Sequence, residues 1–405
     1  MKMKHLQTMD HVDLNKKRVI LRADLNVPMK NGQVADCSRL YAITETLKEL
    51  AECHASITLI SHFGRPKNAH NANYSLRPVI QRLSEIIRDK NIPLTCNFRE
   101  DMFFEETINL SKNKSTEQML CLENLRFFSG EKNNDKEFAK HLALFGDTYI
   151  NDAFSCCHRA HASIEAIAHL LPSFAGRLLE KEIKMLTQIM EATQKPLVAI
   201  IGGSKVSTKL HVLSSLIKKV DVMFVGGAMA NSFLKCLGYE VGKSLVEENM
   251  LCQAKKIMND AKKESCQLVL PIDVTVADSL DVNVETNVVA VENIDKEKMC
   301  LDIGPKTVGR LSGFLDKAKL ILWNGPVGAF EIKPFGKGSF ALAKKIAQLT
   351  QDNKCQSIVG GGDTLSVISQ CDLQKDFTYC SMAGGAFLEW LEGKELPGIK
   401  VLMTT

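Results

Sequence analysis

The sequence lacks the features that mark membrane-spanning, secreted or nucleic-acid-binding proteins. Its formal net charge is only +4 over 405 residues, too small to indicate a nucleic-acid or acidic membrane partner without local clustering. No apolar run approaches the roughly 20 residues that a spanning helix needs. The start, MKMKHLQTMD, is polar where a signal peptide would be apolar. We therefore expect a soluble, cytoplasmic protein with no nucleic-acid and no membrane partner.

Cysteines at redox or zinc spacing are also absent. The chain has 13 cysteines, but the odd number, the irregular spacing and the lack of any C-x-x-C argue against a disulfide framework. Cys156 and Cys157 are adjacent and poorly placed to bridge each other. His158 and His161 form a close pair with no second pair beside it, so a metal role for them is not favoured. We expect reduced, mostly buried thiols, as in a reducing compartment.

Two familiar nucleotide-binding motifs are missing. No G-x-G-x-x-G follows the first predicted strand of either half, which weakens the case for an NAD-dependent oxidoreductase. Residues 238–244 (GYEVGKS) are one residue short of a P-loop and follow no convincing strand, so we predict a turn with a helix start there.

What the sequence does have is one repeated pattern. Its length exceeds what one core normally supports, which predicts two domains. Short apolar runs are each followed by polar or glycine residues and then by a helical pattern; unbroken runs of this kind indicate parallel strands that are buried on both faces. This predicts two α/β domains with parallel sheets flanked by helices, and the charged helical stretch 176–192 is a plausible connector between them. The runs lie at 18–21, 57–60, 119–122, 148–150, 197–201, 222–225, 267–270, 320–323, 356–359 and 379–382.

Glycine and lysine dominate the strand ends of the second half. The helical pattern after Gly202-Gly203 places Lys205 and Lys209 in its first turns, where a bound polyphosphate would explain two cations at a positive helix end. A solvated face is an equally good explanation of this motif alone. The run Gly360-Gly361-Gly362-Asp363-Thr364 is more telling, because three glycines let a phosphate approach the backbone.

Other residues extend this candidate nucleotide site. Asp363 could hold Mg²⁺, or it could cap the helix that begins near Thr364. The loop 324–326, which begins with Asn324, and Glu331 beyond it suit contacts to ribose and adenine. Glycine pairs at 226–227 and 384–385 add two more points of close approach.

The strand ends of the first half carry cations instead. Arginine forks bind phosphate and carboxylate, and a hydroxyl group needs an acceptor such as Asp24. The joint indication is a site for a small acid that bears phosphate and hydroxyl groups, although any single arginine could be structural, Arg22 most readily. The residues in this zone are Arg22, Asp24, Asn26, Arg39, His62, Arg65, Arg126, His158, Arg159 and His161.

These strings, in this order, resemble the phosphoglycerate kinase family from about Leu14 to Gly398. The resemblance is carried by 22–28 (RADLNVP), 61–66 (SHFGRP), 123–127 (ENLRF), 151–154 (NDAF), 158–161 (HRAH), 202–209 (GGSKVSTK), 323–331 (WNGPVGAFE), 360–364 (GGGDT) and 391–398 (LEGKELPG).

The resemblance implies two Rossmann-like domains joined by a helical hinge. One, at 1–175 plus 393–405, would bind 3-phosphoglycerate or 1,3-bisphosphoglycerate through Asp24, Asn26, Arg39, His62, Arg65, Arg126 and Arg159. The other, at 193–392, would bind ADP or ATP with Mg²⁺ through Gly203, Lys205, Lys209, Asn324, Glu331, Gly360, Gly361, Gly362, Asp363 and Thr364.

It also implies the reaction and its main participants. A phosphoryl group would pass directly, in line, between the acyl phosphate and ADP, with Arg39 and Lys205 stabilising it, Asp363 holding the metal and hinge closure excluding water. A monomer is the family expectation.

The sequence departs from the family at the last glycine loop, where Met382-Ala383 replaces Thr-Gly, and at Ser204 and Ala228. Ala383 adopts a positive φ less freely than glycine does, so turnover and closure are in question. The alternatives are an NAD-dependent oxidoreductase, and a non-catalytic nucleotide- or RNA-binding protein with this fold. The latter is disfavoured because Arg39, Lys205 and Asp363 are all present.

Overall fold

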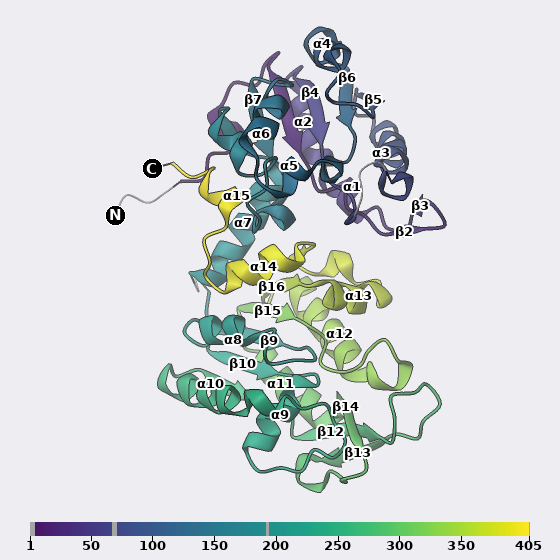
Figure 1. Cartoon of the computed structure of the whole chain (residues 1–405). Helices are drawn as coiled ribbons and strands as arrows, with labels where there is room; N and C mark the ends of the chain where they lie inside the picture. The colour runs from purple at the N-terminus through teal and green to yellow at the C-terminus, as the bar shows by residue number, and fades with distance from the viewer. Residues whose placement is uncertain (1–4, 67–70, 192–193, 405) are drawn as a thin grey trace. The chain divides into compact units, whose positions relative to one another are not determined.

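The computed structural model describes residues 5–66, 71–191 and 194–404. The chain divides into two compact units, Met1–Lys184 with Glu395–Thr405 and Met185–Lys394. The expected domain and connector ranges include residues 1–4, 67–70, 192–193 and 405, which lie outside the described residues. Each unit is built around its own parallel sheet with helices packed on it (Figure 1).

The first unit contains a six-stranded parallel sheet in the order β5-β6-β4-β1-β7-β8, and a short hairpin, β2-β3. The strands are β1 (Arg18–Arg22), β2 (Met29–Lys30), β3 (Gln33–Val34), β4 (Ser56–Ile60), β5 (Thr95–Arg99), β6 (Gln118–Leu122), β7 (Thr148–Asn151) and β8 (Ser173–Ala175). The helices are α1 (Ser38–Ala42), α2 (Thr44–Glu52), α3 (Arg77–Asp89), α4 (Glu105–Asn113), α5 (Ser129–Lys132), α6 (Lys136–Ala143), α7 (Arg177–Met190) and, from the returning C-terminal segment, α15 (Pro397–Lys400).

Both faces of this sheet are apolar, as continuous hydrophobic strands require. In β1, Val19 and Leu21 belong to one core cluster and Ile20 to another, because successive side chains of a strand point to opposite faces. Helices α2 and α3 complete the first cluster, and α6 contributes to the second.

The second unit has a six-stranded parallel sheet in the order β11-β10-β9-β15-β16-β17, and beside it a three-stranded antiparallel sheet, β13-β12-β14. The strands are β9 (Leu197–Ile201), β10 (Val222–Val225), β11 (Gln267–Val269), β12 (Asp273–Ala277), β13 (Asn287–Ala290), β14 (Met299–Ile303), β15 (Leu320–Asn324), β16 (Gln356–Gly360) and β17 (Tyr379–Ser381). The helices are α8 (Leu210–Leu216), α9 (Met229–Cys236), α10 (Leu251–Lys263), α11 (Pro305–Leu315), α12 (Lys337–Gln351), α13 (Gly362–Gln370) and α14 (Gly384–Leu391).

The ten apolar runs all form parallel strands, which confirms the predicted fold class. The prediction missed β5 and β8, which complete the first sheet, and the whole antiparallel sheet of the second unit. β5 (TCNFR) alternates polar and apolar residues and is only partly buried at the sheet edge, so it carries no continuous apolar run.

Three local expectations meet different outcomes. The helix predicted at 176–192 is α7, whose residues belong to both units. The stretch 238–244 does turn, at Gly242 with its φ of 56°, but the expected helix start was wrong, because helical structure resumes only at Glu248. The helical pattern expected directly after Gly202-Gly203 also overstated α8, which begins at Leu210.

All 13 cysteines are free thiols, and of these only Cys252 is exposed, as expected for a chain of reduced thiols. Within the described ranges, none of the helices combines the length and apolar character that a bilayer span needs.

Candidate active site

The polar residues of the first unit meet at the carboxyl ends of its central strands. Strand β1 lies between β4 and β7, with Arg22 in register with both Ile60 and Asn151. The segments that follow these three strands therefore emerge at one edge of the sheet, where ligands of such folds bind.

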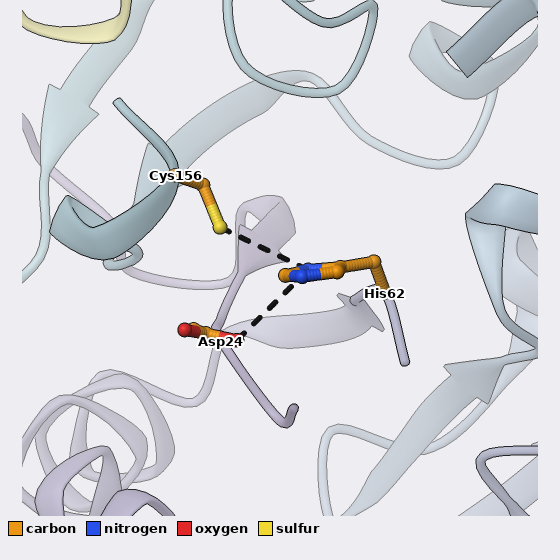
Figure 2. A group of neighbouring side chains, drawn as sticks. All are labelled: Asp24, His62 and Cys156. Atoms are coloured by element: carbon orange, nitrogen blue, oxygen red, sulfur yellow. Dashed lines mark hydrogen bonds and ion pairs between the residues drawn. The ribbon is translucent and has the colours of Figure 1, made fainter. Parts of the chain in front are cut away.

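Asp24 is the centre of this group of residues, the candidate acid site. Its Oδ2 accepts hydrogen bonds from the guanidinium of Arg39, on α1, and from the hydroxyl of Ser155. His62, just after β4, brings its Nδ1 to 3.9 Å from Asp24 Oδ1 (Figure 2). Burial raises the pKa of Asp24, but the charge of Arg39 and the hydrogen bond from the Ser155 hydroxyl act against it, and the pKa is lowered to about 2. Asp24 is thus ionised at neutral pH and able to accept a hydrogen bond from a ligand hydroxyl.

Cys156 completes a buried group with Asp24 and His62, and its Sγ lies 3.8 Å from His62 Nδ1 (Figure 2). The three residue types could ligate a metal ion, but the guanidinium of Arg22 lies 3.0 Å from His62 Nδ1 and 3.7 Å from Cys156 Sγ. A cation placed among these atoms would be repelled by Arg22, so we assign the group to an anion site.

A second strand-end cluster fixes Arg126. Asn26 Oδ1 accepts a bond of 2.8 Å from the N–H of Gly64, and Arg126 donates one of 2.6 Å to the carbonyl oxygen of Gly64. Asn124 supports the same loop, because its Oδ1 accepts hydrogen bonds from the backbone N–H groups of Phe63 and Arg126. Burial lowers the pKa of Arg126 to about 10, so the side chain stays charged at neutral pH.

The remaining predicted cations are less tightly held. Arg65 is exposed and makes no hydrogen bond to another predicted site residue within the described part of the chain. Arg159 is half-buried and donates a bond of 3.0 Å to His158 Nε2. Burial and the charge of Arg159 lower the pKa of His158 to about 4, so His158 accepts this bond as a neutral ring. Arg22 is completely buried, in agreement with its expected structural assignment.

In the second unit, glycine loops pack backbone against backbone at the strand ends. A Cβ on Gly325, whose φ is 96°, would lie 2.2 Å from the carbonyl oxygen of Gly202. A Cβ on Gly227, with a φ of 68°, would lie 2.6 Å from that of Gly203. These loops follow β9, β10 and β15, and β9 and β15 are the neighbours at which the strand order of this sheet reverses.

Side chains then join these glycine loops to the end of the neighbouring strand, β16. Lys209 donates a hydrogen bond to Asn324 Oδ1, and Asn324 Nδ2 donates one of 2.6 Å to the carbonyl oxygen of Gly360. The hydroxyl of Thr364 accepts a bond of 2.7 Å from the N–H of Gly325. Burial lowers the pKa of Lys209 to about 8, against the opposing effect of Asp363.

Gly361, Gly362 and Asp363 stand at the start of α13, with Gly361 in the cap position at a φ of 98°. The alternative that Asp363 caps this helix is therefore wrong. Asp363 is exposed and has no hydrogen-bond partner among the described residues. Gly360 has a packing reason to lack a side chain, since a Cβ there would lie 2.5 Å from the Phe387 ring.

A cavity of about 320 Å³ opens beside these glycine loops. Its wall combines glycine backbone, apolar side chains and two carboxylates, a lining that suits a flat heteroaromatic base with a charged tail. Among the lining residues are Gly203, Gly227, Leu245, Leu280, Leu301, Pro326, Glu331 and Asp363.

Two predicted features have a different local structure from the one expected. Lys205 and Lys209 lie in the segment before α8 and not in its first turns, and Lys205 is exposed. Ala383 is buried with a φ of −96°, so this loop does not need the positive φ that alanine resists.

Sequence reasoning missed several residues of these sites. Ser155 and Cys156 gave no signal, because their respective partners, Asp24 and His62, lie 131 and 94 positions away along the chain. Leu245 and Leu280 line the cavity although each is 48% exposed; large exposed apolar side chains are a signal that only the structure reveals.

Comparison with known proteins gives a consistent result. A family model described as phosphoglycerate kinase matches residues 9–394. The phosphoglycerate kinase of Chelativorans sp. (strain BNC1) is 44% identical over 98% of each chain, and that of Rhodospirillum centenum is 46% identical over 98% of this chain and 99% of its own. The solved structure of phosphoglycerate kinase from Coxiella burnetii superposes with a TM-score of 0.88 at 39% identity, covering 98% of this chain and 99% of that one.

Proposed function

Because the chain belongs to the phosphoglycerate kinase family, we propose that its two units divide the reaction of that family between them. The protein is a phosphotransferase of glycolysis that moves a phosphoryl group reversibly from 1,3-bisphosphoglycerate to ADP, giving 3-phosphoglycerate and ATP. The observation that carries the division of labour is the contrast between the cationic acid site of the first unit and the glycine-lined cavity of the second.

The acid site would bind phosphoglycerate. Asp24, held ionised, accepts a hydrogen bond from the hydroxyl group of the substrate, and His62 donates one to an oxygen of the acid. Asn26 and Arg126 hold the loop that contains Gly64. Arg65, Arg126 and Arg159 supply the positive charge that phosphate and carboxylate groups require.

The second unit would bind the nucleotide. The cavity takes the base and ribose, with Glu331 at its edge. Phosphates lie against Gly203, the segment from Gly360 to Thr364 that leads from β16 into α13, and the ammonium groups of Lys205 and Lys209. Asn324 keeps Lys209 in place.

Asp363 would hold Mg²⁺. Its exposed carboxylate has no hydrogen-bond partner among the described residues, and it lines the nucleotide cavity. One carboxylate together with substrate phosphates and water is the ligand set that Mg²⁺ prefers in proteins. When bound, the ion supplies neutralisation of phosphate charge.

Transfer then requires placement more than side-chain chemistry. A carboxylate oxygen of the acid is already a competent nucleophile, so no general base is needed in the ATP-consuming direction. Arg39 and Lys205 stabilise the transferring group. Since Arg39 belongs to one unit and Lys205 to the other, we propose that α7 acts as a hinge and that closure completes the site and excludes water. We also propose that the protein works as a cytoplasmic monomer.

A coupled assay tests the proposal. The protein is given 3-phosphoglycerate, ATP and Mg²⁺, and the formation of 1,3-bisphosphoglycerate is followed through a coupling dehydrogenase. We expect turnover that depends on all three components. Failure to turn over, with ATP still raising the melting temperature, would point to a non-catalytic nucleotide-binding protein. A rise caused by NADH and not by ATP would point to the oxidoreductase alternative.

A further inference from the structure

Arg22 lies at the end of β1, directly behind the acid site, and is completely buried. Its hydrogen-bond donors are used within the first unit. Nε donates a bond of 2.9 Å to the Ser163 hydroxyl, and Nη1 donates to the carbonyl oxygen of Ala23. Nη2 lies 3.0 Å from His62 Nδ1. A guanidinium has donors only and stays protonated in proteins, so every partner of Arg22 must act as an acceptor.

This fixes the protonation of the His62 ring. Because Arg22 can only donate, Nδ1 must carry the lone pair, and the single proton of a neutral ring then sits on Nε2. The Sγ of Cys156, at 3.8 Å from Nδ1, can add a weak donor on the same side. Asp24 Oδ1, at 3.9 Å, is too far away to draw a proton onto Nδ1.

The charged groups around the ring favour the same neutral state. Burial lowers the pKa of His62 well below its usual value, and the Asp24 carboxylate acts in the opposite direction. Arg22 on β1, Arg126 after β6 and Arg39 on α1 lower the pKa further. The ring thus faces three guanidinium groups and one carboxylate.

The guanidinium is itself held in a fixed orientation. The hydroxyl of Ser163, which accepts from Arg22, donates a bond of 2.7 Å to Glu131 Oε1, and the N–H of Ser163 donates one of 3.0 Å to Glu131 Oε2. Glu131 is completely buried. Arg22 is therefore aimed at His62 by a buried carboxylate that acts through one hydroxyl.

We propose that Arg22 is a positioning residue for phosphoglycerate: it holds His62 as the neutral tautomer whose Nε2–H donates to an oxygen of the bound acid. Among the described residues, Nε2 has no hydrogen-bond partner, so this donor is left for a ligand. The inference rests on the proposed function of the acid site, but the tautomer can be measured without substrate.

The first test is the ring itself. The unmodified protein is labelled with ¹⁵N-histidine, and its ten histidines are compared with those of His62→Gln to identify the missing ring. Without ligand, between about pH 6 and 8, we expect His62 to show a protonated Nε2 and an unprotonated Nδ1. A proton on Nδ1, or an imidazolium at neutral pH, would overturn the proposal and leave the kinase activity of the protein untouched as a separate question.

The second test uses variants with a kinetic readout. In Arg22→Gln the phosphoglycerate KM should rise roughly tenfold, as for the loss of one well-placed hydrogen bond, while the nucleotide KM stays within about twofold. The pH profile of kcat/KM for phosphoglycerate should gain an acid limb between about pH 5 and 7 as His62 begins to titrate. A merely structural role would lower stability or kcat but leave this profile unchanged, and an unchanged profile in the folded variant contradicts the proposal.

Removing Arg22 takes a buried positive charge away from the buried Glu131 carboxylate, which keeps His161 Nδ1 at 3.6 Å as its ion-pair partner, and this loss of charge threatens folding. Ser163→Ala keeps both charges and removes only the hydroxyl between them. We expect it to raise the phosphoglycerate KM roughly two- to fivefold and to broaden or shift the His62 ring signals. Arg88→Gln, an exposed position on α3, is the matched control and should change none of these readouts. If Ser163→Ala and this control behave alike in both readouts, the proposal fails.

Discussion

The two units have similar parallel sheets, but the ends of their strands are built by different means. In the first, the strand ends carry side chains joined in a buried network, with Asp24, Arg39 and His62 at its centre. In the second, the strand ends carry glycines whose backbones touch, and the groups proposed to bind phosphate are N–H groups and lysines. The comparison teaches that a side-chain site can lose one donor at a time, whereas a backbone site depends on keeping its close contacts.

The strand orders differ too. Counting the parallel strands of each sheet along the chain, the second unit has the order 3-2-1-4-5-6, and the first has 3-4-2-1-5-6. Both place the first strand centrally, so the segments after β1 and β9 reach the middle of the edge formed by the carboxyl ends of the strands. The two proposed sites thus occupy equivalent places on sheets whose strand orders differ.

The largest expected effect comes from comparing the two residues proposed to stabilise the transferring group. Lys205→Ala and Arg39→Ala should each lower kcat on the order of 10²- to 10³-fold, because each removes charge stabilisation from the transition state. The KM changes should separate them: nucleotide KM rises modestly in Lys205→Ala, and phosphoglycerate KM rises in Arg39→Ala. Steady-state kinetics measures both.

Lys218→Ala, at an exposed position in the second unit, controls for the loss of a lysine. Near-normal turnover in Lys205→Ala would refute the role of Lys205. A matching change in both KM values would break the division between the sites.

A backbone site predicts sensitivity to a single methyl group. Gly325→Ala forces a positive φ and a contact of 2.2 Å with Gly202, so we expect the free energy of unfolding of the second unit to fall by about 2–3 kcal/mol. ADP affinity should fall with it. Tryptophan fluorescence in urea measures this specifically, because Trp323 and Trp390 both belong to that unit.

The control is Gly309→Ala. Gly309 lies inside α11 with nothing within 4 Å of an added Cβ, so alanine there should be neutral or stabilise by up to about 1 kcal/mol. Equal responses at the two glycines would show that the close packing of the loops is not what the site depends on.

The two sites should also respond differently to pH. The pKa of Lys209 is lowered to about 8, chiefly by burial, so above that pH the amine loses the charge that attracts phosphate. We expect the ADP dissociation constant to rise several-fold, by about the strength of one charge-assisted hydrogen bond, as the pH goes from 7 to about 9.5. The 3-phosphoglycerate dissociation constant should change little up to about pH 9, because the arginines remain charged. Titration calorimetry measures both constants.

Lys209→Arg keeps its charge and should remove the alkaline weakening of ADP binding. If ADP binding by the unmodified protein does not depend on pH in this range, Lys209 does not bind phosphate through its charge.

The smallest expected signal concerns the two sites acting together. With both substrates bound, solution scattering should give a radius of gyration a little smaller than with either substrate alone, because closure brings Arg39 and Lys205 to one phosphoryl group. An unchanged radius would count against hinge closure and leave each separate site intact.

The sequence predicted most of the fold because its central strands are buried on both faces. Leu197–Ile201, for example, is apolar at every position, so its pattern indicates a strand that is buried on both faces. The antiparallel sheet escaped prediction because β13 is largely exposed and β14 mixes polar and apolar residues. Helix α8 begins later than predicted. Val206 is buried although it lies before the helix, and its spacing from Leu210 matches a helical pattern.

The candidate site was likewise predicted where a local sequence pattern marks it and missed where none does. The position of Asp24, His62 and Asn324 at the ends of predicted strands was enough to single them out, because the carboxyl ends of parallel strands lie at one edge of a sheet. It could not assign Gly360, whose missing side chain makes room for Phe387, a residue of a later helix. Ser155 was missed for the same reason: contacts between distant segments leave no local pattern.

The returning segment 395–404 has a consequence for how the molecule is made. Gly398 donates a hydrogen bond of 3.0 Å to the carbonyl oxygen of Cys157, and Gln7 donates one of 2.8 Å to Leu402. The first unit is thus completed by residues that the ribosome adds only after all of Met185–Lys394. Domains usually finish folding in the order of synthesis. Here the half that is begun first is finished last, and the proposed phosphoglycerate site acquires its full support only when translation has passed the proposed nucleotide site.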